Sequence, residues 1–107
     1  MIYKIAFYVP ESHCDAVKDA LFLAGAGRIG NYSHCAWQTR GTGQFKPNQD
    51  SQPHLGERNE LCTVIEYKVE LVCDAKNLKS VLSALLKSHP YEEPAYEAYQ
   101  ILKLDDL

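Results

Sequence analysis

The sequence lacks several features that mark large classes of proteins. Its four cysteines include no C-x-x-C pair, which excludes a zinc knuckle or a thioredoxin-type redox motif. No apolar run is long enough to cross a bilayer, and no signal-peptide cleavage pattern follows the first residues. The formal net charge is −3, so no excess of positive charge would attract nucleic acid or an anionic membrane. We therefore expect a cytoplasmic protein with reduced cysteines, and neither nucleic acid nor membrane as a partner.

The composition that is present fits a single globular domain. The chain has 107 residues and 46% of them are hydrophobic. A chain of this size buries roughly two-thirds of its unfolded surface and leaves no room for a second domain. Residues 1–107 are therefore predicted to form one unit, in which the cysteines serve mainly as small hydrophobic residues of the core.

Hydrophobic periodicity in the first part of the chain predicts a strand followed by a helix. Apolar residues alternate with others over 2–9, which indicates a strand with one well-buried side. Ser12 and Asp15 form a potential capping box, and apolar residues then recur at helical spacing to about Ala24. The glycines directly after this segment are typical of a helix end.

The middle of the chain predicts an extended segment and a long loop. The stretch NYSHCAWQTRG carries aromatic and small residues without a helical period. Gly41 and Gly43 allow a reversal, so a hairpin with a turn at GTGQF is the simplest interpretation. Residues 46–61 are polar, hold two prolines and lack periodicity. We expect a loop there, and loops of this length are usually functional or mobile.

The last part repeats the order of strand, helix and strand. Residues 63–73 alternate between an apolar face and a charged face, as in a half-buried strand. Asp74 is placed to cap a second helix, which Pro90 forces to end near His89. A final strand is predicted within 95–102.

This order of elements predicts an α+β fold of the ferredoxin-like (βαββαβ) type. In that two-layer sandwich, an antiparallel sheet carries two helices on one face and leaves the other face open. Large strand side chains on the open face would make it an oligomer interface. The candidates for this role are Tyr8, Tyr32 and either Tyr96 or Tyr99.

Three motifs are more specific than the fold. GAGRIGNYSHCAW, RGTGQFKP and HPYEEPAY closely resemble the signature of the YqfO-type domain, a PII/CutA-like module of the NGG1-interacting-factor-three-like family. The resemblance covers essentially the whole chain. It implies a fold similar to the trimeric CutA and PII signalling proteins. In the longer family members the module lies over a core domain that holds the dinuclear metal site, and the histidine-rich motif of that core is absent here. The resemblance therefore implies a free-standing module without the family's proposed hydrolase activity.

The stretch GRIGNYSHCAW is the first candidate site. His34 and Cys35 are donors that suit a soft or borderline transition metal. In a strand, however, successive side chains point to opposite faces, so the two residues cannot easily bind one ion. The alternative is that Cys35 and Trp37 pack under the helices while Tyr32 and His34 line the open sheet face.

The turn HPYEEPAY is the second candidate site. His89, Glu92 and Glu93 could bind a divalent ion or position a proton. The alternative is conformational, since Pro90 and Pro94 fix the turn and the glutamates are then simply solvated. The ligand-binding or interface candidates are Asn31, Tyr32, His34 and Tyr91, and the metal candidates are His34, His89, Glu92 and Glu93.

These observations lead to two hypotheses about function. The first is a non-catalytic regulatory or binding module of PII/CutA type, assembled as a homo-oligomer and, by the resemblance, as a trimer. A divalent transition metal or a small anionic ligand would bind in an intersubunit cleft where His34 meets the HPYEE turn, and the loop 46–61 would face a protein partner. The alternative is a detached lid or subunit of a metal-dependent hydrolase whose catalytic core lies on another chain.

Overall fold

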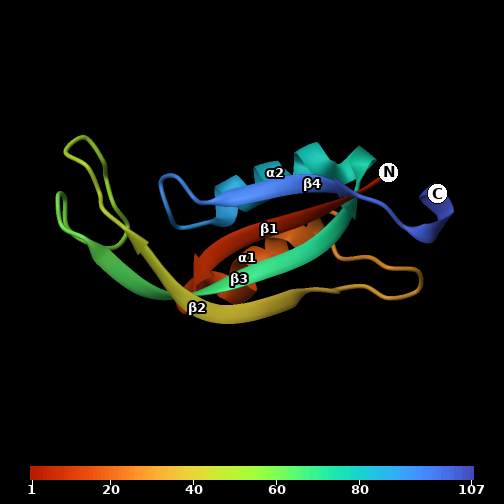
Figure 1. Ribbon diagram of the computed structural model, residues 1–107, viewed down its shortest axis with the longest axis horizontal. Coiled ribbons are helices and arrows are strands. Elements are labelled where there is room, and N and C mark those ends of the chain that lie inside the picture. Colours follow the sequence, from red (N-terminus) through yellow and green to blue (C-terminus); the bar gives the residue numbers. More distant parts are fainter.

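The computed structural model describes residues 1–107 and shows four strands and two helices (Figure 1). The elements are β1 (Ile2–Pro10), α1 (Glu11–Leu23), β2 (Trp37–Phe45), β3 (Cys62–Asp74), α2 (Ala75–Ser88) and β4 (Tyr96–Ile101), followed by a short 3₁₀ turn, Leu104–Asp106. This is the predicted order of elements. Neither helix is long and apolar enough to cross a membrane.

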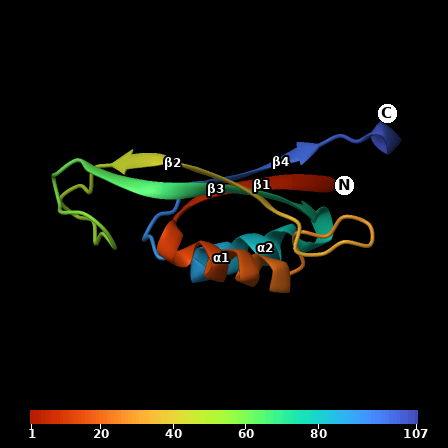
Figure 2. The same cartoon turned by 90° about the horizontal axis from the view of Figure 1, so that it is seen from below.

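The strands form one antiparallel sheet in the order β2-β3-β1-β4, with both helices on the same face (Figure 2). The predicted α+β, ferredoxin-like sandwich is therefore confirmed. Buried apolar residues occupy alternate positions of β1 and of β3, where charged residues fill the positions between them in β3, so one face of each strand packs on the helices. The other face of the sheet is open and carries Glu66, Lys68 and Glu70 in the centre.

The core lies between the sheet and the two helices. Its fully buried members come from four elements: Ile5, Phe7 and Val9 of β1, Val17 and Leu21 of α1, Val69 of β3, and Val81 and Leu85 of α2. Cys14 and Cys73 are also buried and unpaired, which agrees with their expected role as core residues. Cys35 and Cys62 are only partly buried.

The helix ends lie where the sequence predicts them, but their side-chain caps are absent. α1 begins directly after Pro10 without a side-chain cap, and Ser12 instead bonds the neighbouring His13 ring (Oγ to Nδ1, 2.8 Å). Asp74 occupies the N-cap position of α2 and also makes no side-chain cap bond. Gly25 and Gly27, at φ of 113° and 79°, end α1 in the left-handed region that favours glycine.

The prediction of a hairpin at Gly41 and Gly43 is wrong. β2 runs through both glycines without reversal and pairs with β3 along its whole length, from Trp37 opposite Glu70 to Phe45 opposite Cys62. The reversal lies instead in the loop 46–61, which is irregular as expected. β2 and β3 extend past the helices and give the molecule its long axis of 48 Å (Figures 1 and 2).

Candidate functional site

A pocket of about 390 Å³ lies at the end of the molecule where β2 and β3 project beyond the helices. Three segments surround it: the loop 46–61, the turn 91–95, and strand residues that include Tyr8, Gly43 and Glu66. These segments are far apart in the sequence, and the loop and the turn lie at the left end in Figure 1. The sheet brings them together because β1 and β3 are neighbours and β2 pairs with β3.

Glu66 and Tyr91 join the sheet to the turn at the pocket wall. The Tyr91 hydroxyl donates a hydrogen bond to Glu66 Oε2 at 2.9 Å. Burial raises the pKa of Tyr91, and the hydrogen bond and negative charge of Glu66 raise this pKa further, so the phenol keeps its proton at neutral pH. On the neighbouring strand β2, Gly43 lies next to this carboxylate, two residues beyond the position directly opposite Glu66, and a Cβ atom there would collide with Glu66 Oε1. The absence of a side chain at Gly43 thus leaves room for the Glu66 carboxylate.

The loop 46–61 is attached to the turn and to α1. Glu92 accepts a hydrogen bond from the backbone N–H of Gln52, with a distance of 3.1 Å to Oε2. The His54 ring lies between two others, at centroid distances of 5.4 Å from His13 on α1 and 6.2 Å from Tyr91 on the turn. Figure 2 shows the loop curving toward the helix layer, where His13 lies. These contacts hold the loop over the pocket.

His89 lies beside Tyr91 of the pocket lining, and its ring makes hydrogen bonds that stabilise the fold. It is only 6% exposed, and its Nε2–H donates to the Tyr8 carbonyl oxygen at 2.6 Å. Its Nδ1 accepts the backbone N–H of Tyr91 at 3.1 Å. Burial lowers the pKa of His89, and the nearby His13 and His54 lower it further, against the opposing effect of the bond to Tyr8. Within one chain, both ring nitrogens are therefore occupied, and neither is free to bind a metal.

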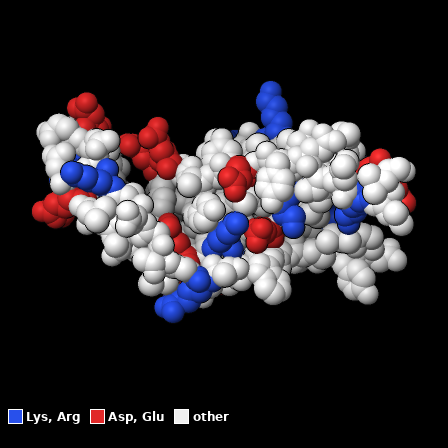
Figure 3. Space-filling view, in the orientation of Figure 1, with Lys and Arg blue, Asp and Glu red and all other residues white.

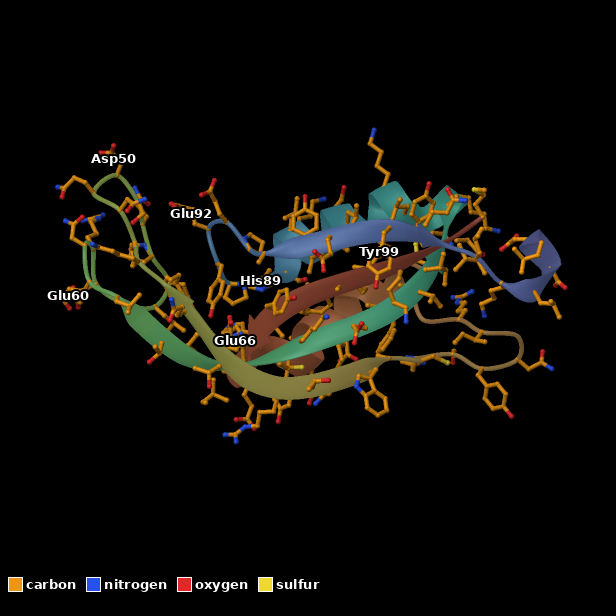
Figure 4. All side chains as sticks on the ribbon, in the orientation of Figure 1. Asp50, Glu60, Glu66, His89, Glu92 and Tyr99 are labelled. Carbon is orange, nitrogen blue, oxygen red and sulfur yellow. The ribbon has the colours of Figure 1, made fainter.

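The other predicted site residues lie at the opposite end of the sandwich, in the loop between α1 and β2. His34 packs on Phe22 near the end of α1, with ring centroids 4.8 Å apart, whereas His13 at the start of α1 contacts His54 of the pocket lining. Asn31 and Tyr32 are exposed in the same loop. A single chain therefore does not bring His34 together with the turn that contains Glu92, which Figure 4 shows at the other end.

The arrangement expected around Trp37 is wrong in its details. Residues 31–36 are not a strand, and His34 has a φ of 59°, so the alternation of strand side chains does not apply to His34 and Cys35. Trp37 opens β2 and pairs with Glu70, which places it on the open sheet face, where it is 69% exposed. It does not pack under the helices. Of the four tyrosines considered, Tyr8 and Tyr99 share the open face, Tyr96 is on the helix side and Tyr32 is in the loop.

No group of three or more histidine, cysteine, aspartate or glutamate side chains in the chain is arranged to hold a metal ion. The carboxylates of Glu92 and Glu93 border the pocket, but His89 is engaged below it and His34 is distant. The buried thiols are also poor nucleophiles, because burial raises the pKa of Cys14 and of Cys73.

Sequence reasoning missed several residues that line the pocket, chiefly Glu66, Gly43, Phe45 and His54, and His13, which contacts His54. Their sequence separation hides the contacts, since Glu66 and Tyr91 are brought together only by the sheet. One local signal was present: a glycine within a strand often marks the close approach of another group. Gly43 was instead interpreted as part of a turn.

Comparison with known proteins finds relatives that share one description. The chain is 45% identical over 100 residues to a "GTP cyclohydrolase 1 type 2 homolog" of Halalkalibacterium halodurans and 47% identical over 98 residues to the Bacillus subtilis protein of the same description. These matches cover 94% and 92% of the chain but 27% and 26% of the relatives, so the chain spans about a quarter of their length. No family model matches the sequence.

Solved structures resemble the chain over nearly its full length. A Bacillus cereus protein related to NIF3 superposes with a TM-score of 0.78 at 39% identity, over 92% of this chain and 25% of that one. CutA from Archaeoglobus fulgidus superposes with a TM-score of 0.69 over 96% of this chain and 86% of its own, at 13% identity, which supports the shared fold alone. The chain therefore belongs to the NGG1-interacting-factor-three-like family, as a YqfO-type domain with the PII/CutA-like fold.

Proposed function

We propose that the chain is a non-catalytic, oligomeric binding module in which the open sheet face is the contact between copies. The observation that carries this proposal is the pair of exposed aromatic side chains that border that face, Trp37 and Tyr99. Trp37 is 69% exposed and Tyr99 is 47% exposed, and both point away from the helices. Exposed aromatic residues on an unpaired sheet face are typical of interfaces between subunits.

The proposed assembly is a homotrimer. The resemblance to CutA and PII proteins supports this symmetry, and the fold supplies suitable edges, because β2 and β4 each have one unpaired side. Around the trimer, the exposed loop residues Asn31, Tyr32 and His34 would contact the neighbouring copy. Such a contact could bring His34 toward Glu92 and Glu93 of another subunit, as a divalent transition metal bound between subunits would require.

The pocket beneath the loop 46–61 is the proposed ligand site, and Tyr91 is the central residue of its wall. The loop itself would face a protein partner, since its outer residues are exposed. The sequence suggests two ligand classes, a divalent transition metal and a small anion. The anion is disfavoured, because Glu66, Glu92 and Glu93 border the pocket and no lysine or arginine does. We place the module in the cytoplasm, where its four unpaired cysteines would stay reduced.

Native mass spectrometry of freshly purified protein tests this proposal, because it reports the number of subunits and any retained ligand together. We expect a trimer. Trp37→Lys should dissociate it, because this change replaces an aromatic contact of the interface with a charge. Leu23→Lys is the matched control, since Leu23 is 90% exposed on the helix layer and lies outside the sheet face. A wild-type monomer, or equal dissociation by both variants, would contradict the proposed interface.

The length of the relatives favours a second candidate function. The chain covers only about a quarter of the proteins named GTP cyclohydrolase 1 type 2 homolog. On this alternative, the chain acts as a lid or accessory domain beside a metal-dependent hydrolase core, and its open sheet face contacts that core. Co-purification with a core protein of this family, lost in Trp37→Lys, would favour this function over self-association.

A further inference from the structure

The charges around the pocket are all of one sign. Glu66, Glu92 and Glu93 contribute carboxylates, and no lysine or arginine lies in the lining. Figure 4 shows Glu66 and Glu92 reaching the pocket end from the sheet and from the turn. In Figure 3, several acidic side chains lie at the same end of the molecule, over the loop and the neighbouring turn, with a basic side chain among them on the loop.

Aromatic side chains form a large part of the remaining wall. The Tyr91 ring packs against Phe45 at 5.8 Å and against His54 at 6.2 Å between centroids, and Tyr8 lines the floor. Aromatic faces carry partial negative charge and attract cations. The wall therefore combines flat apolar surface with carboxylates, and both favour a positively charged ligand over an anion.

Two further properties restrict the type of cation. The pocket volume of about 390 Å³ falls in the range of small-molecule sites, which run from about 300 Å³ upward. The carboxylates are not gathered around one point: Glu66 Oε2 accepts the Tyr91 hydroxyl, Glu92 accepts the Gln52 N–H, and no group of three ligands is arranged for a metal. A bulky cation with an apolar body fits this arrangement better than a bare ion.

We propose that this pocket binds a small organic cation, in which an ammonium or guanidinium group is carried on an apolar or aromatic body. The charged group lies near Glu66 and Glu93, and the body packs on Tyr91 and Phe45 beneath the loop. Because the lining contains several acidic groups, attraction should weaken as ionic strength rises. This inference rests on the proposed function, since it takes the pocket to be the ligand site of the module.

A charge series on one ring tests the proposal. The full chain, labelled with ¹⁵N, is titrated with benzylammonium, benzyl alcohol and benzoate, and the amide signals of Gly43, Tyr91 and Glu93 are followed. We expect benzylammonium to bind about tenfold more tightly than benzyl alcohol, because only the cation gains both the carboxylate and the ring attraction. Benzoate should cause no shift at these amides.

Two variants, each of which removes one carboxylate charge, test which residues bind the cation. Glu93→Gln should weaken benzylammonium binding about threefold, and it removes no hydrogen bond recorded in the fold. Glu66→Gln should weaken it at least as much. Glu60→Gln is the matched control, since Glu60 is an exposed loop glutamate outside the lining, and its affinity should equal that of the wild type.

Several results would overturn the proposal: equal binding of the three probes, tighter binding of benzoate, no shift with benzylammonium, or wild-type affinity in Glu93→Gln. The oligomeric state is measured separately on the same sample. A trimer that ignores benzylammonium refutes the cation site and leaves the oligomeric module intact. A monomer that binds benzylammonium refutes the proposed assembly and leaves the cation site intact.

Discussion

At the scale of single residues, His89 shows how a polar residue from a prominent motif can serve the fold. Its two ring nitrogens connect the end of α2 to β1 and to the turn, through the Tyr8 carbonyl and the Tyr91 N–H. Each of these backbone groups would lose its partner if the imidazole were removed, and unsatisfied buried polar groups are costly. The histidine of HPYEEPAY is thus a structural residue, and the glutamates that follow it reach the pocket.

Replacing His89 with asparagine should lower the free energy of unfolding by about 2 kcal/mol at neutral pH, because a shorter side chain cannot reach both partners. Urea unfolding measures this loss. His34→Asn is the matched control, since His34 is exposed at the other end and bonds only its neighbour Ser33. An equal loss in the two variants would argue against a special role for the contacts of His89.

The same residue predicts a pH dependence. Burial lowers the pKa of His89, so the unfolded chain binds a proton more readily than the folded chain does. The stability supplied by the neutral imidazole is present above about pH 6.5 and is lost as pH falls below that value. Urea unfolding midpoints, measured as the pH is lowered through about 6.5, should fall more steeply with pH for the wild type than for His89→Asn. Parallel profiles would contradict this origin of the acid sensitivity.

Two glycines of β2 make an internal comparison. A Cβ at Gly41 meets no atom within 4 Å, whereas a Cβ at Gly43 would collide with Glu66. Because alanine suits a strand better than glycine does, Gly41→Ala should be neutral or stabilise the fold by about 0.5 kcal/mol. Gly43→Ala should displace the Glu66 carboxylate and weaken its bond to Tyr91, with a net loss of about 1 kcal/mol. Equal thermal stability of the two variants would show that Glu66 moves aside freely.

At the scale of elements, the loop 46–61 and the turn 91–95 act together. Glu92 and His54 provide the cross-contacts between them, and Arg58 braces the loop from within by donating its Nε–H to the Ser51 carbonyl at 2.6 Å. These contacts are few and largely exposed. Such segments open more readily than the core does.

Removing the Glu92 contact should release the loop. In Glu92→Gln the Gln52 N–H loses a charged acceptor, which costs about 1 kcal/mol and corresponds to about fivefold more frequent opening. Limited trypsin digestion after Arg58 reports this opening as a faster first cleavage. Glu93→Gln is the matched control, because Glu93 makes no recorded bond to the loop. Cleavage at the same rate in both variants would mean that Glu92 does not hold the loop.

The element order could be predicted because it depends on local patterns. The alternation in 63–73 predicts which face of the strand is buried, and apolar residues of α2 recur at helical spacing in the same way. The core agrees with these patterns at Val69, Val81 and Leu85. β2 could not be assigned in the same way. It is an edge strand whose residues are mostly exposed, so it lacks a buried face to set a period, and its glycines imitate a turn.

The candidate site was predictable only in part. Tyr91, Glu92 and Glu93 belong to a compact motif and do border the pocket. Glu66 and His54 could not be connected to them, because that requires the register of β2 on β3 and the path of the loop. His34 is expected to meet the turn only between subunits, and within one chain α1 separates the two.

At the scale of the whole molecule, the two faces of the sheet have different roles. The helix face holds the core, and the open face presents charges in its centre with Trp37 on β2 and Tyr99 on β4. Small residues also belong to this face: Ala6 is only 1% exposed between Glu70 and Glu97. The open face therefore combines a charged centre with aromatic side chains at its borders.

The single tryptophan makes assembly measurable by fluorescence. If the open face is buried between copies, dilution should expose Trp37 and shift its emission to longer wavelength, with a concentration dependence that follows the subunit equilibrium. Tyr99→Glu should shift the transition to higher protein concentration by at least about tenfold, because a charge is introduced into the same contact. An emission spectrum that does not change with concentration, together with a monomeric mass, would contradict burial of this face.

The position of β1 in the sheet bears on how the chain folds. Ile2 lies opposite Asp74 on one side and opposite Ile101 on the other, so both neighbours of the first strand are distant in sequence. β2 and β3 are joined by the loop 46–61 and pair over a much shorter separation. Closing long loops costs more conformational entropy and slows folding. We therefore expect the β2–β3 ribbon to form early, and the first strand of the sequence to be the last to acquire both of its neighbours.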